Sequence, residues 1–225
     1  MLGECEVNEV SDERKQAVLI RLVNKYPELQ VCVDDIREAA ALIANSYRQG
    51  GKLLVCGNGG SSSDSDHIVG ELMKGFMSKR PLPETMKQAF HQQFPTDGAY
   101  LADHLQGALP AISLTSATAL ISAYANDVAA DMVYAQQVFG YGNPGDVCLG
   151  ISTSGNSVNV IRALQTAKVR GLVTIGLTGQ SGGKMDALCD ITIKVPYDCT
   201  PDIQERHLPI YHAICILLEL EFFHS

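Results

Sequence analysis

The sequence predicts an α/β fold with a parallel sheet covered by helices on both faces. Short apolar runs alternate with helical stretches, which is the pattern of βαβ units. These runs are apolar almost without interruption, as expected for strands whose two faces are both buried. The chain has 225 residues, enough for one domain of this kind with its own core. We therefore expect a single domain over residues 1–225.

Each predicted element follows from the order of these runs. The five expected strands are residues 52–56, 110–114, 146–152, 172–178 and 191–195. The helices expected between and after them are residues 64–77, 117–139, 157–169 and 202–222, with a short helix after Gly183. Polar loops rich in Ser and Gly follow the first and third strands, so the strand–loop–helix unit occurs twice.

Two regions lie outside this alternation. Residues 1–50 are predicted to form N-terminal helices: one over 12–24, with Ser11 as N-cap and Pro27 beyond its end, and one over about 34–48.

Residues 79–108 contain three prolines and polar helical sequence, and are predicted to be an inserted helical excursion. Short helices are expected over 84–94 and 98–106, separated by turn-forming residues near Pro95. Such a segment has too little apolar surface to fold alone. We expect it to cap the cleft near Asn126 and the first loop; the alternative is that it thickens a subunit interface.

Composition excludes several classes of function. The formal net charge is -8, from 25 acidic and 17 basic residues, and no window concentrates Lys and Arg, so nucleic-acid binding is not expected. No apolar run approaches the roughly 20 residues of a membrane helix, and the N-terminus lacks the features of a signal peptide. The seven cysteines include no CxxC pair and several lie in apolar runs, which indicates reduced thiols and a cytoplasmic protein.

The two Ser/Gly loops predict phosphate binding. The first contains Asn58, Gly59, Gly60 and Ser61, and the second contains Ser152, Thr153, Ser154 and Ser157. In an open parallel sheet, ligands bind beyond the carboxyl ends of the strands. Glycines let the backbone approach an anion, and hydroxyls and helix N-terminal N–H groups donate to phosphate oxygens. Neither loop has the Lys of a Walker A motif, and Ser62 replaces the last Gly of a dinucleotide fingerprint.

Acid–base or metal chemistry is indicated on two helices. His67 and Glu71 are four residues apart and share one helix face after the first loop, although a surface contact is the more common explanation of such a pair. The last helix carries His212 together with Gln204 and Glu205, and the residues alone leave open which of the last two faces inward. Pro209 is expected to kink that helix.

A further pair, Asn126 and Asp127, has two interpretations. A turn or capping role is the ordinary one for such residues, and contact with a substrate is the alternative.

These stretches resemble the sugar isomerase (SIS) domain proteins, and specifically their phosphoheptose isomerase branch. The resemblance is carried by CGNGGSSSDSDHIVGEL, GYGNPGDVCLGISTSGNSVNVIRAL, GLTGQSGGKM and PDIQERHLPIYH. It spans about residues 33–220 and leaves the insertion uncovered. It implies a flavodoxin-like three-layer α/β/α sandwich with a five-stranded parallel sheet, assembled as a homotetramer.

The resemblance also implies a function and a site. Members interconvert sedoheptulose 7-phosphate and D-glycero-D-manno-heptose 7-phosphate in heptose biosynthesis, and many bind zinc. The family's zinc ligands fall on His67, Glu71, Gln204 and His212, one ion per subunit. Its general base falls on Glu71 and its general acid on His212. Its phosphate contacts fall on Ser61, Ser152, Ser154 and Ser157, and its substrate-facing pair on Asn126 and Asp127.

Two alternatives stay open at this point. One is a non-catalytic adaptor or sugar-phosphate sensor of the same superfamily, such as those that bind the replication initiator protein. Those adaptors typically lack the final histidine, whereas His212 is present here. The other is an isomerase that acts on a different ketose phosphate.

Overall fold

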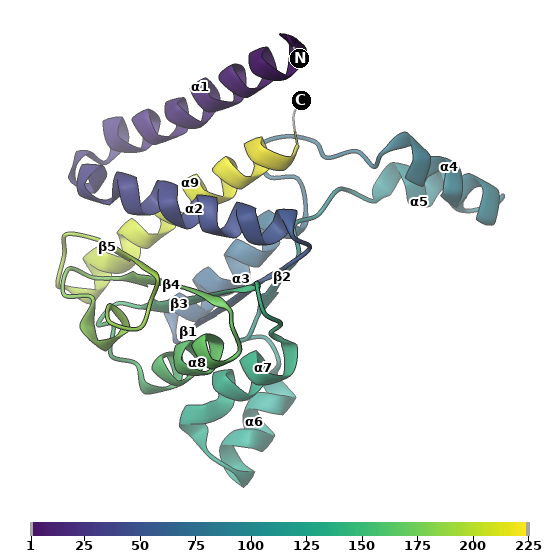
Figure 1. The fold of residues 1–225 in the computed structure, drawn as a ribbon. Helices are drawn as coiled ribbons and strands as arrows, with labels where there is room; N and C mark the ends of the chain where they lie inside the picture. Colours follow the sequence, from purple (N-terminus) through teal and green to yellow (C-terminus); the bar gives the residue numbers. More distant parts are fainter. Residues whose placement is uncertain (1, 224–225) are drawn as a thin grey trace.

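The fold is a five-stranded parallel sheet between two layers of helices (Figure 1). The computed structural model describes residues 2–223, with side chains from residue 12 onward. The strands are β1 (Leu53–Gly57), β2 (Ala111–Ser113), β3 (Val147–Ser152), β4 (Val173–Thr178) and β5 (Ile191–Lys194). Their order, β2-β1-β3-β4-β5, is that of flavodoxin-like sheets, and all neighbours are parallel. The predicted fold class is confirmed.

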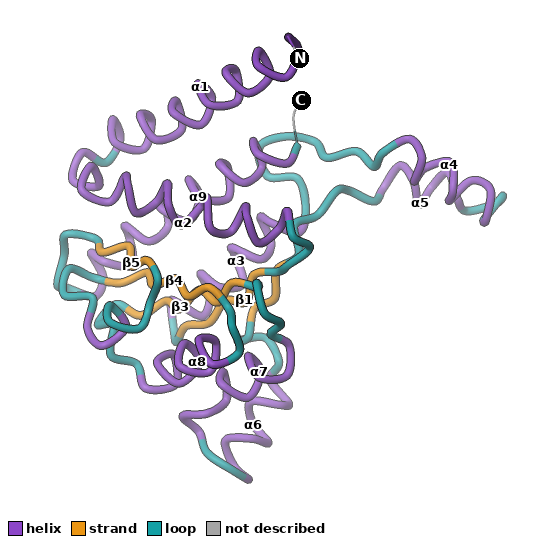
Figure 2. Tube along the Cα trace, viewed as in Figure 1, coloured by secondary structure: helices purple, strands orange, loops and turns teal. Residues whose placement is uncertain are grey.

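The helices account for the rest of the regular structure, as Figure 2 shows. The α-helices are α1 (Leu2–Lys25), α2 (Val33–Arg48), α3 (Gly60–Met73), α4 (Glu84–Gln93), α5 (Gly98–His104), α6 (Thr118–Asp127), α7 (Val133–Tyr141), α8 (Val158–Val169) and α9 (Thr200–Phe222). The 3-10 turns are η1 (Pro27–Cys32), η2 (Ala130–Met132) and η3 (Gly183–Met185).

The core divides into two apolar clusters, one on each face of the sheet. Helices α2, α3 and α9 cover one face, and α1 packs on α9 outside them. Helices α7 and α8 cover the other face. Alternate residues of β1 supply both clusters: Leu53 and Val55 face the first, and Leu54 and Cys56 face the second. This division explains why the strands are apolar without interruption.

Three helix boundaries differ from the prediction. The first helix begins at Leu2, so Ser11 lies inside it and is not its N-cap; the side chain of Ser11 is outside the described residues. Helix α3 begins at Gly60 rather than near residue 64, because the glycine turn comes earlier than the serine run suggested. The helix expected over 117–139 is broken at Ala129, since α7 turns to bury Tyr134 and Val138 beside α8 while α6 buries no side chain.

The predicted insertion forms a helical hairpin, which we call the arm (residues 82–106). Helices α4 and α5 pack on each other, and Gly98 and Ala102 are its only buried residues. Figure 1 shows the arm standing away from the body of the molecule. Helix α6, which carries Asn126, lies on the other side of the sheet from the arm. The expected cap over the cleft near Asn126 is therefore wrong within one chain. The reason is geometric: residues 76–81 direct the arm outward.

Three further expectations can be compared with the structure. Within residues 2–223, no helix is long and apolar enough to cross a membrane. Six cysteines are free thiols, at positions 32, 56, 148, 189, 199 and 215, and Cys5 lies outside the described side chains. Helix α9 continues through Pro209.

His207 gives a testable pH dependence of stability. Its ring is fully buried, Nε2 lies 3.4 Å from the Thr178 carbonyl, and burial lowers its pKa to about 4. In the unfolded chain His207 binds a proton as the pH falls below 6.5, whereas in the folded chain it binds one only near pH 4. The free energy of unfolding should therefore fall as the pH drops from 6.5 through about 4. Urea unfolding at several pH values should show a smaller fall in His207→Gln; equal slopes in both proteins would contradict this.

Candidate active site

The two Ser/Gly loops lie side by side at the carboxyl edge of the sheet. They follow β1 and β3, the neighbouring strands between which the strand order reverses, which is where open α/β sheets bind ligands. Asn58 and Asn159 tie them together, because each amide donates to the other's oxygen, at 2.8 and 2.9 Å. The two loops that the sequence predicts to bind phosphate are therefore neighbours at one edge of the sheet.

The first loop depends on a close approach by the last helix. A side chain at Gly60 would place its Cβ 2.8 Å from the amide nitrogen of Gln204, so it would displace that amide from its present position. Gly59 before it has a φ of +57°, in the left-handed region that favours glycine. Ser61 is buried in the first turn of α3, whereas Ser63 is exposed. The N-terminus of α3 and the amide of Gln204 therefore lie next to each other at the first loop.

The second loop places its hydroxyls at the end of β3. The hydroxyl of Ser152, the last residue of that strand, lies 2.9 Å from the hydroxyl of Ser157, which precedes α8. Ser154 is exposed and Thr153 is half-buried. Gly155 packs against the loop after β4, where a Cβ would lie 2.0 Å from the Gly182 carbonyl oxygen. Backbone packing therefore fixes the position of these hydroxyls.

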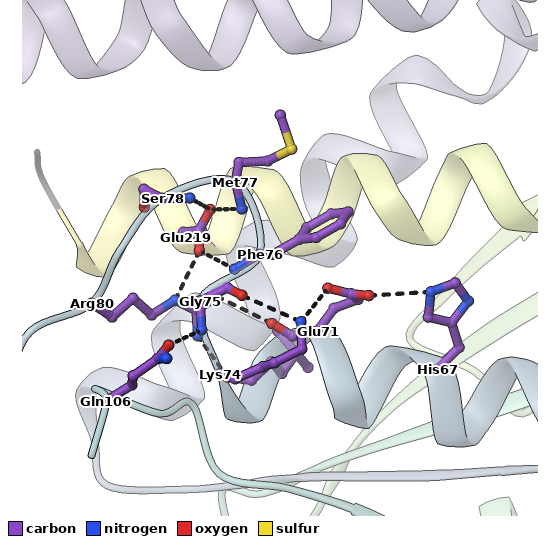
Figure 3. A network of polar contacts seen from close by, with 11 residues as sticks. His67, Glu71, Lys74, Gly75, Phe76, Met77, Ser78, Arg80, Gln106 and Glu219 are labelled. Carbon is purple, nitrogen blue, oxygen red and sulfur yellow. Dashed lines mark hydrogen bonds and ion pairs between the residues drawn. The ribbon is translucent and has the colours of Figure 1, made fainter. Parts of the chain in front are cut away.

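Three of the predicted chemical side chains converge between α3 and α9. His67 Nε2 lies 3.2 Å from Glu71 Oε1 on α3, as expected from their spacing. The ring of His212, on the adjacent helix α9, lies 5.0 Å from the ring of His67, centroid to centroid. Lys74 Nζ contacts the other Glu71 oxygen at 3.3 Å. Figure 3 shows the contacts of Glu71 with His67 and Lys74.

A chain of hydrogen bonds orients His67. The Tyr211 hydroxyl donates to Asp64 at 3.2 Å, and His67 Nδ1 lies 3.0 Å from that hydroxyl oxygen. Because the Tyr211 hydroxyl donates its hydrogen bond to Asp64, its oxygen can accept one from Nδ1–H of His67. The Nε2 of His67 then faces the Glu71 carboxylate, an arrangement that a proton or a cation on Nε2 stabilises.

The surroundings of His212 disfavour its protonated form and leave one ring nitrogen unpaired among the described residues. Burial, followed by the charge of His67, lowers its pKa, while Glu71 opposes that shift. Its Nε2 is buried and has no hydrogen-bond partner among the described residues. The ring of Phe76 lies next to the His212 ring, at 5.3 Å between the two ring centroids. A buried, unpaired nitrogen is a group that a ligand or metal would satisfy.

The last helix presents Gln204, and not Glu205, to the first loop. Glu205 is largely exposed and pairs with Arg206, whereas the amide of Gln204 lies over Gly60. His67, Glu71, Gln204 and His212 are therefore a donor set of the types that zinc accepts, and the free nitrogen of His212 fits a metal. Even so, among the described side chains no three His, Cys, Asp or Glu residues are placed to hold one ion together. The structure brings His67, Glu71 and His212 together, but these three do not form a coordination sphere.

Asn126 and Asp127 are not brought to this site in one chain. Both are exposed at the end of α6, where the Asn126 amide donates to Asp127 at 2.8 Å. Helix α6 packs on α7 and η2, on the other side of the sheet from His67 and His212.

Sequence reasoning missed the residues that support the site. Tyr211 and Asp64 orient His67, Asn159 joins the loops, and Phe76 covers His212. Tyr211 adjoins His212 and Asp64 precedes His67 by one turn, but neither spacing is distinctive. The loop after β2 also carries hydroxyls, and Ser116 donates to Asp66 of α3 at 2.5 Å.

A second cleft lies away from this site. It has a volume of about 700 Å³ and lies between α1, α2 and α9. Its floor includes Leu19, Ala44 and Leu217, and Lys15 and Arg48 both pair with Glu221 at its rim. None of the candidate residues lines it, so we place the chemistry at the strand ends.

The chain is similar to known proteins over most of its length. The SIS domain family matches residues 28–105 and 98–179, two matches that meet within the arm. A phosphoheptose isomerase of Rhodospirillum rubrum is 39% identical over 84% of this chain and 86% of its own length. Phosphoheptose isomerase 2 of Campylobacter jejuni is 39% identical over 84% of this chain and 81% of its own.

Solved structures agree. Phosphoheptose isomerase from Neisseria gonorrhoeae superposes with a TM-score of 0.69 at 32% identity, covering 97% of this chain and 99% of that one. The enzyme from Francisella tularensis gives 0.71 at 29% identity, covering 97% and 98%.

The loop geometry predicts how phosphate is recognised. Ser152→Ala combined with Ser154→Ala should raise the KM for a sugar phosphate about tenfold or more, since hydrogen bonds to charged groups contribute about 1.5–3 kcal/mol each. Steady-state kinetics measure this, with Ser122→Ala on exposed α6 as the control. An unchanged KM in the double variant would show that phosphate binds elsewhere.

Proposed function

Because the chain belongs to the phosphoheptose isomerase family of SIS-domain proteins and is an isomerase, we propose that it interconverts sedoheptulose 7-phosphate and D-glycero-D-manno-heptose 7-phosphate. The observation that carries the proposal is the contact of the His67–Glu71 pair with His212, on two helices that begin at the sheet edge where the two hydroxyl-rich loops lie. The first supplies acid and base, and the second supplies a phosphate anchor. A non-catalytic adaptor would need only the second.

The reaction moves one proton between neighbouring carbons. In our proposal, Glu71 removes the proton from the carbon next to the ketose carbonyl, and His212 delivers a proton to the carbonyl oxygen, giving an enediol. The enediol then loses a hydroxyl proton to His212, and the protonated Glu71 returns a proton to the neighbouring carbon to give the aldose. The hydrogen-bonded chain from Asp64 through Tyr211 to His67 holds the environment of Glu71 fixed during these transfers.

We also propose one zinc ion per subunit, held by His67, Glu71, Gln204 and His212. The donor types and the free Nε2 of His212 support this proposal. A bound zinc ion stabilises negative charge that develops on a substrate oxygen. Since His67 Nε2 and Glu71 already face each other, the ion would replace the proton that their contact otherwise needs.

We propose a cytoplasmic homotetramer. Free thiols support a reducing compartment. The open cleft between α1, α2 and α9 and the outward arm support contact with other subunits. Because the arm does not reach the site of its own chain, the interface alternative is now the better explanation for it.

Removal of either proposed proton-transfer group should abolish isomerisation. Glu71→Gln removes the base and His212→Asn the acid, each at a cost of about 10²–10⁴-fold in kcat. Conversion of sedoheptulose 7-phosphate by the purified variants measures this, with circular dichroism as the control for folding. A variant with near-wild-type turnover and unchanged metal content would refute its assigned role.

The metal proposal has its own test. Protein purified without chelator should contain one zinc ion per subunit by elemental analysis, and chelation should lower its Tm, because the site joins α3 to α9. His67→Ala should contain no zinc. Wild-type protein with no bound metal and an unchanged Tm after chelation would exclude the site.

The arm can be removed without disturbing its base. Replacing residues 82–105 with a short Gly/Ser linker should reduce the assembly's molar mass, measured by light scattering, because the arm's exposed Met86, Phe94 and Tyr100 would lose their partner. An intact tetramer with an altered KM would instead restore the cap explanation, acting between subunits.

A further inference from the structure

We propose that Arg80 and Glu219 form a buried clamp that positions Glu71 and His212 for proton transfer. Figure 3 shows the clamp at the end of α3, where the chain leaves for the arm. Both side chains are almost completely buried, with exposed fractions of 1% and 2%. The inference rests on the proposed roles of Glu71 and His212 and adds two positioning residues that touch no substrate.

Arg80 caps the helix that carries Glu71. Helix α3 ends at Met73, so the carbonyls of its last turn have no partner within the helix. The guanidinium donates to the Leu72 carbonyl at 2.7 Å and to the backbone carbonyl of Glu71 at 3.2 Å. Arginine's planar fork can hold two carbonyls and a carboxylate at once, which a lysine ammonium cannot match in geometry. The backbone of Glu71 is thus fixed by a residue nine positions later.

Glu219 holds Arg80 and belongs to the helix that carries His212. Its carboxylate accepts from Arg80 Nε at 2.8 Å and from the N–H groups of Phe76, Met77 and Ser78 at 2.8, 2.8 and 3.1 Å. It lies seven residues, or about two turns, after His212 on α9.

The same loop places Phe76 against His212. The Phe76 N–H is held by Glu219 while its ring lies 5.3 Å from the His212 ring. One carboxylate therefore sets the spacing of the two helices and the cover over the acid.

The pair is more than a contribution to stability. Burying two charges carries a desolvation cost that the ion pair does not always recover, and apolar replacements are often equally stable. The chain offers a matched comparison, since Asp146 is also buried, pairs with Lys52 at 2.6 Å, and accepts the N–H groups of Lys52 and Asn143. That second pair lies at the amino ends of β1 and β3, and its hydrogen bonds go to neither α3 nor α9. Of these two buried ion pairs, only Arg80–Glu219 connects the two helices of the site.

The clamp predicts a specific kinetic signature. A displacement of about 1 Å at a reacting group can lower a rate about 10²-fold. The phosphate loops lie at the N-terminal end of α3, away from the clamp, so substrate binding should change little. Loss of the clamp should therefore lower kcat and leave KM nearly unchanged.

The experiment compares three variants with one control. Arg80→Lys keeps the charge without the fork, Arg80→Met removes both, and Arg80→Met with Glu219→Gln also neutralises the remaining carboxylate. We expect kcat per folded subunit to fall about 10–10²-fold in all three, with KM for sedoheptulose 7-phosphate within about threefold of wild type. The double variant should regain stability over Arg80→Met without regaining kcat. Asp146→Asn should lower Tm and keep kcat.

A readout independent of turnover separates this inference from the proposed function. The imidazole ¹H–¹⁵N signals of His67 and His212 should shift in Arg80→Lys and stay in place in Asp146→Asn. If wild type fails to convert sedoheptulose 7-phosphate, the proposed substrate is wrong, and the imidazole signals still test the clamp. Unchanged kcat and unchanged signals in a folded Arg80→Lys would overturn it, as would an equal loss of kcat in Asp146→Asn.

Discussion

A parallel sheet buried on both faces confines polar chemistry to the ends of its strands. Every side chain of β1 and β3 is buried, so neither face of the sheet can receive a charged substrate. The loops after these two strands are the nearest positions where hydroxyls and backbone N–H groups can meet an anion. Helices α3 and α9 begin at this edge and pack on each other, and they bring the carboxylate and the imidazoles together further along their lengths. The site follows from this constraint more than from any single motif.

The position of Glu71 depends on how firmly the end of α3 is held. Glu71 lies in the last turn of α3, where helices usually fray, and it carries the proposed base. The buried Arg80–Glu219 pair counters this, because the last carbonyls of α3 and the N–H groups of the following loop all find partners. Burial opposes ionisation of Glu219, but the N–H groups of Phe76 and Met77 and the Arg80 guanidinium outweigh it and lower its pKa. The carboxylate therefore stays ionised in a dry environment.

Local patterns predicted the fold well where local interactions decide it. The strands, the two loops and both arm helices were predictable within a few residues, because apolar runs and turn formers determine them. The choice of Gln204 over Glu205 did not follow from the residues alone, which left both open; the family resemblance implied Gln204, and in the structure its amide lies over Gly60. The direction of the arm was also missed, since it depends on a pair of charges 139 residues apart in sequence. The break before α7 reflects packing on α8, which no residue near Ala129 signals.

The central claim is that Glu71 and His212 move a proton between neighbouring carbons of a sugar phosphate. Conversion of sedoheptulose 7-phosphate in deuterium oxide, followed by NMR, tests it most directly. Proton transfer through Glu71 predicts solvent deuterium at carbon 2 of the aldose product, because a carboxylate base exchanges its proton with solvent. Deuterium should be absent from that position when Glu71 is replaced by Gln, since no product forms. Product that forms at full rate with no deuterium at carbon 2 would show a direct hydride shift and contradict the account.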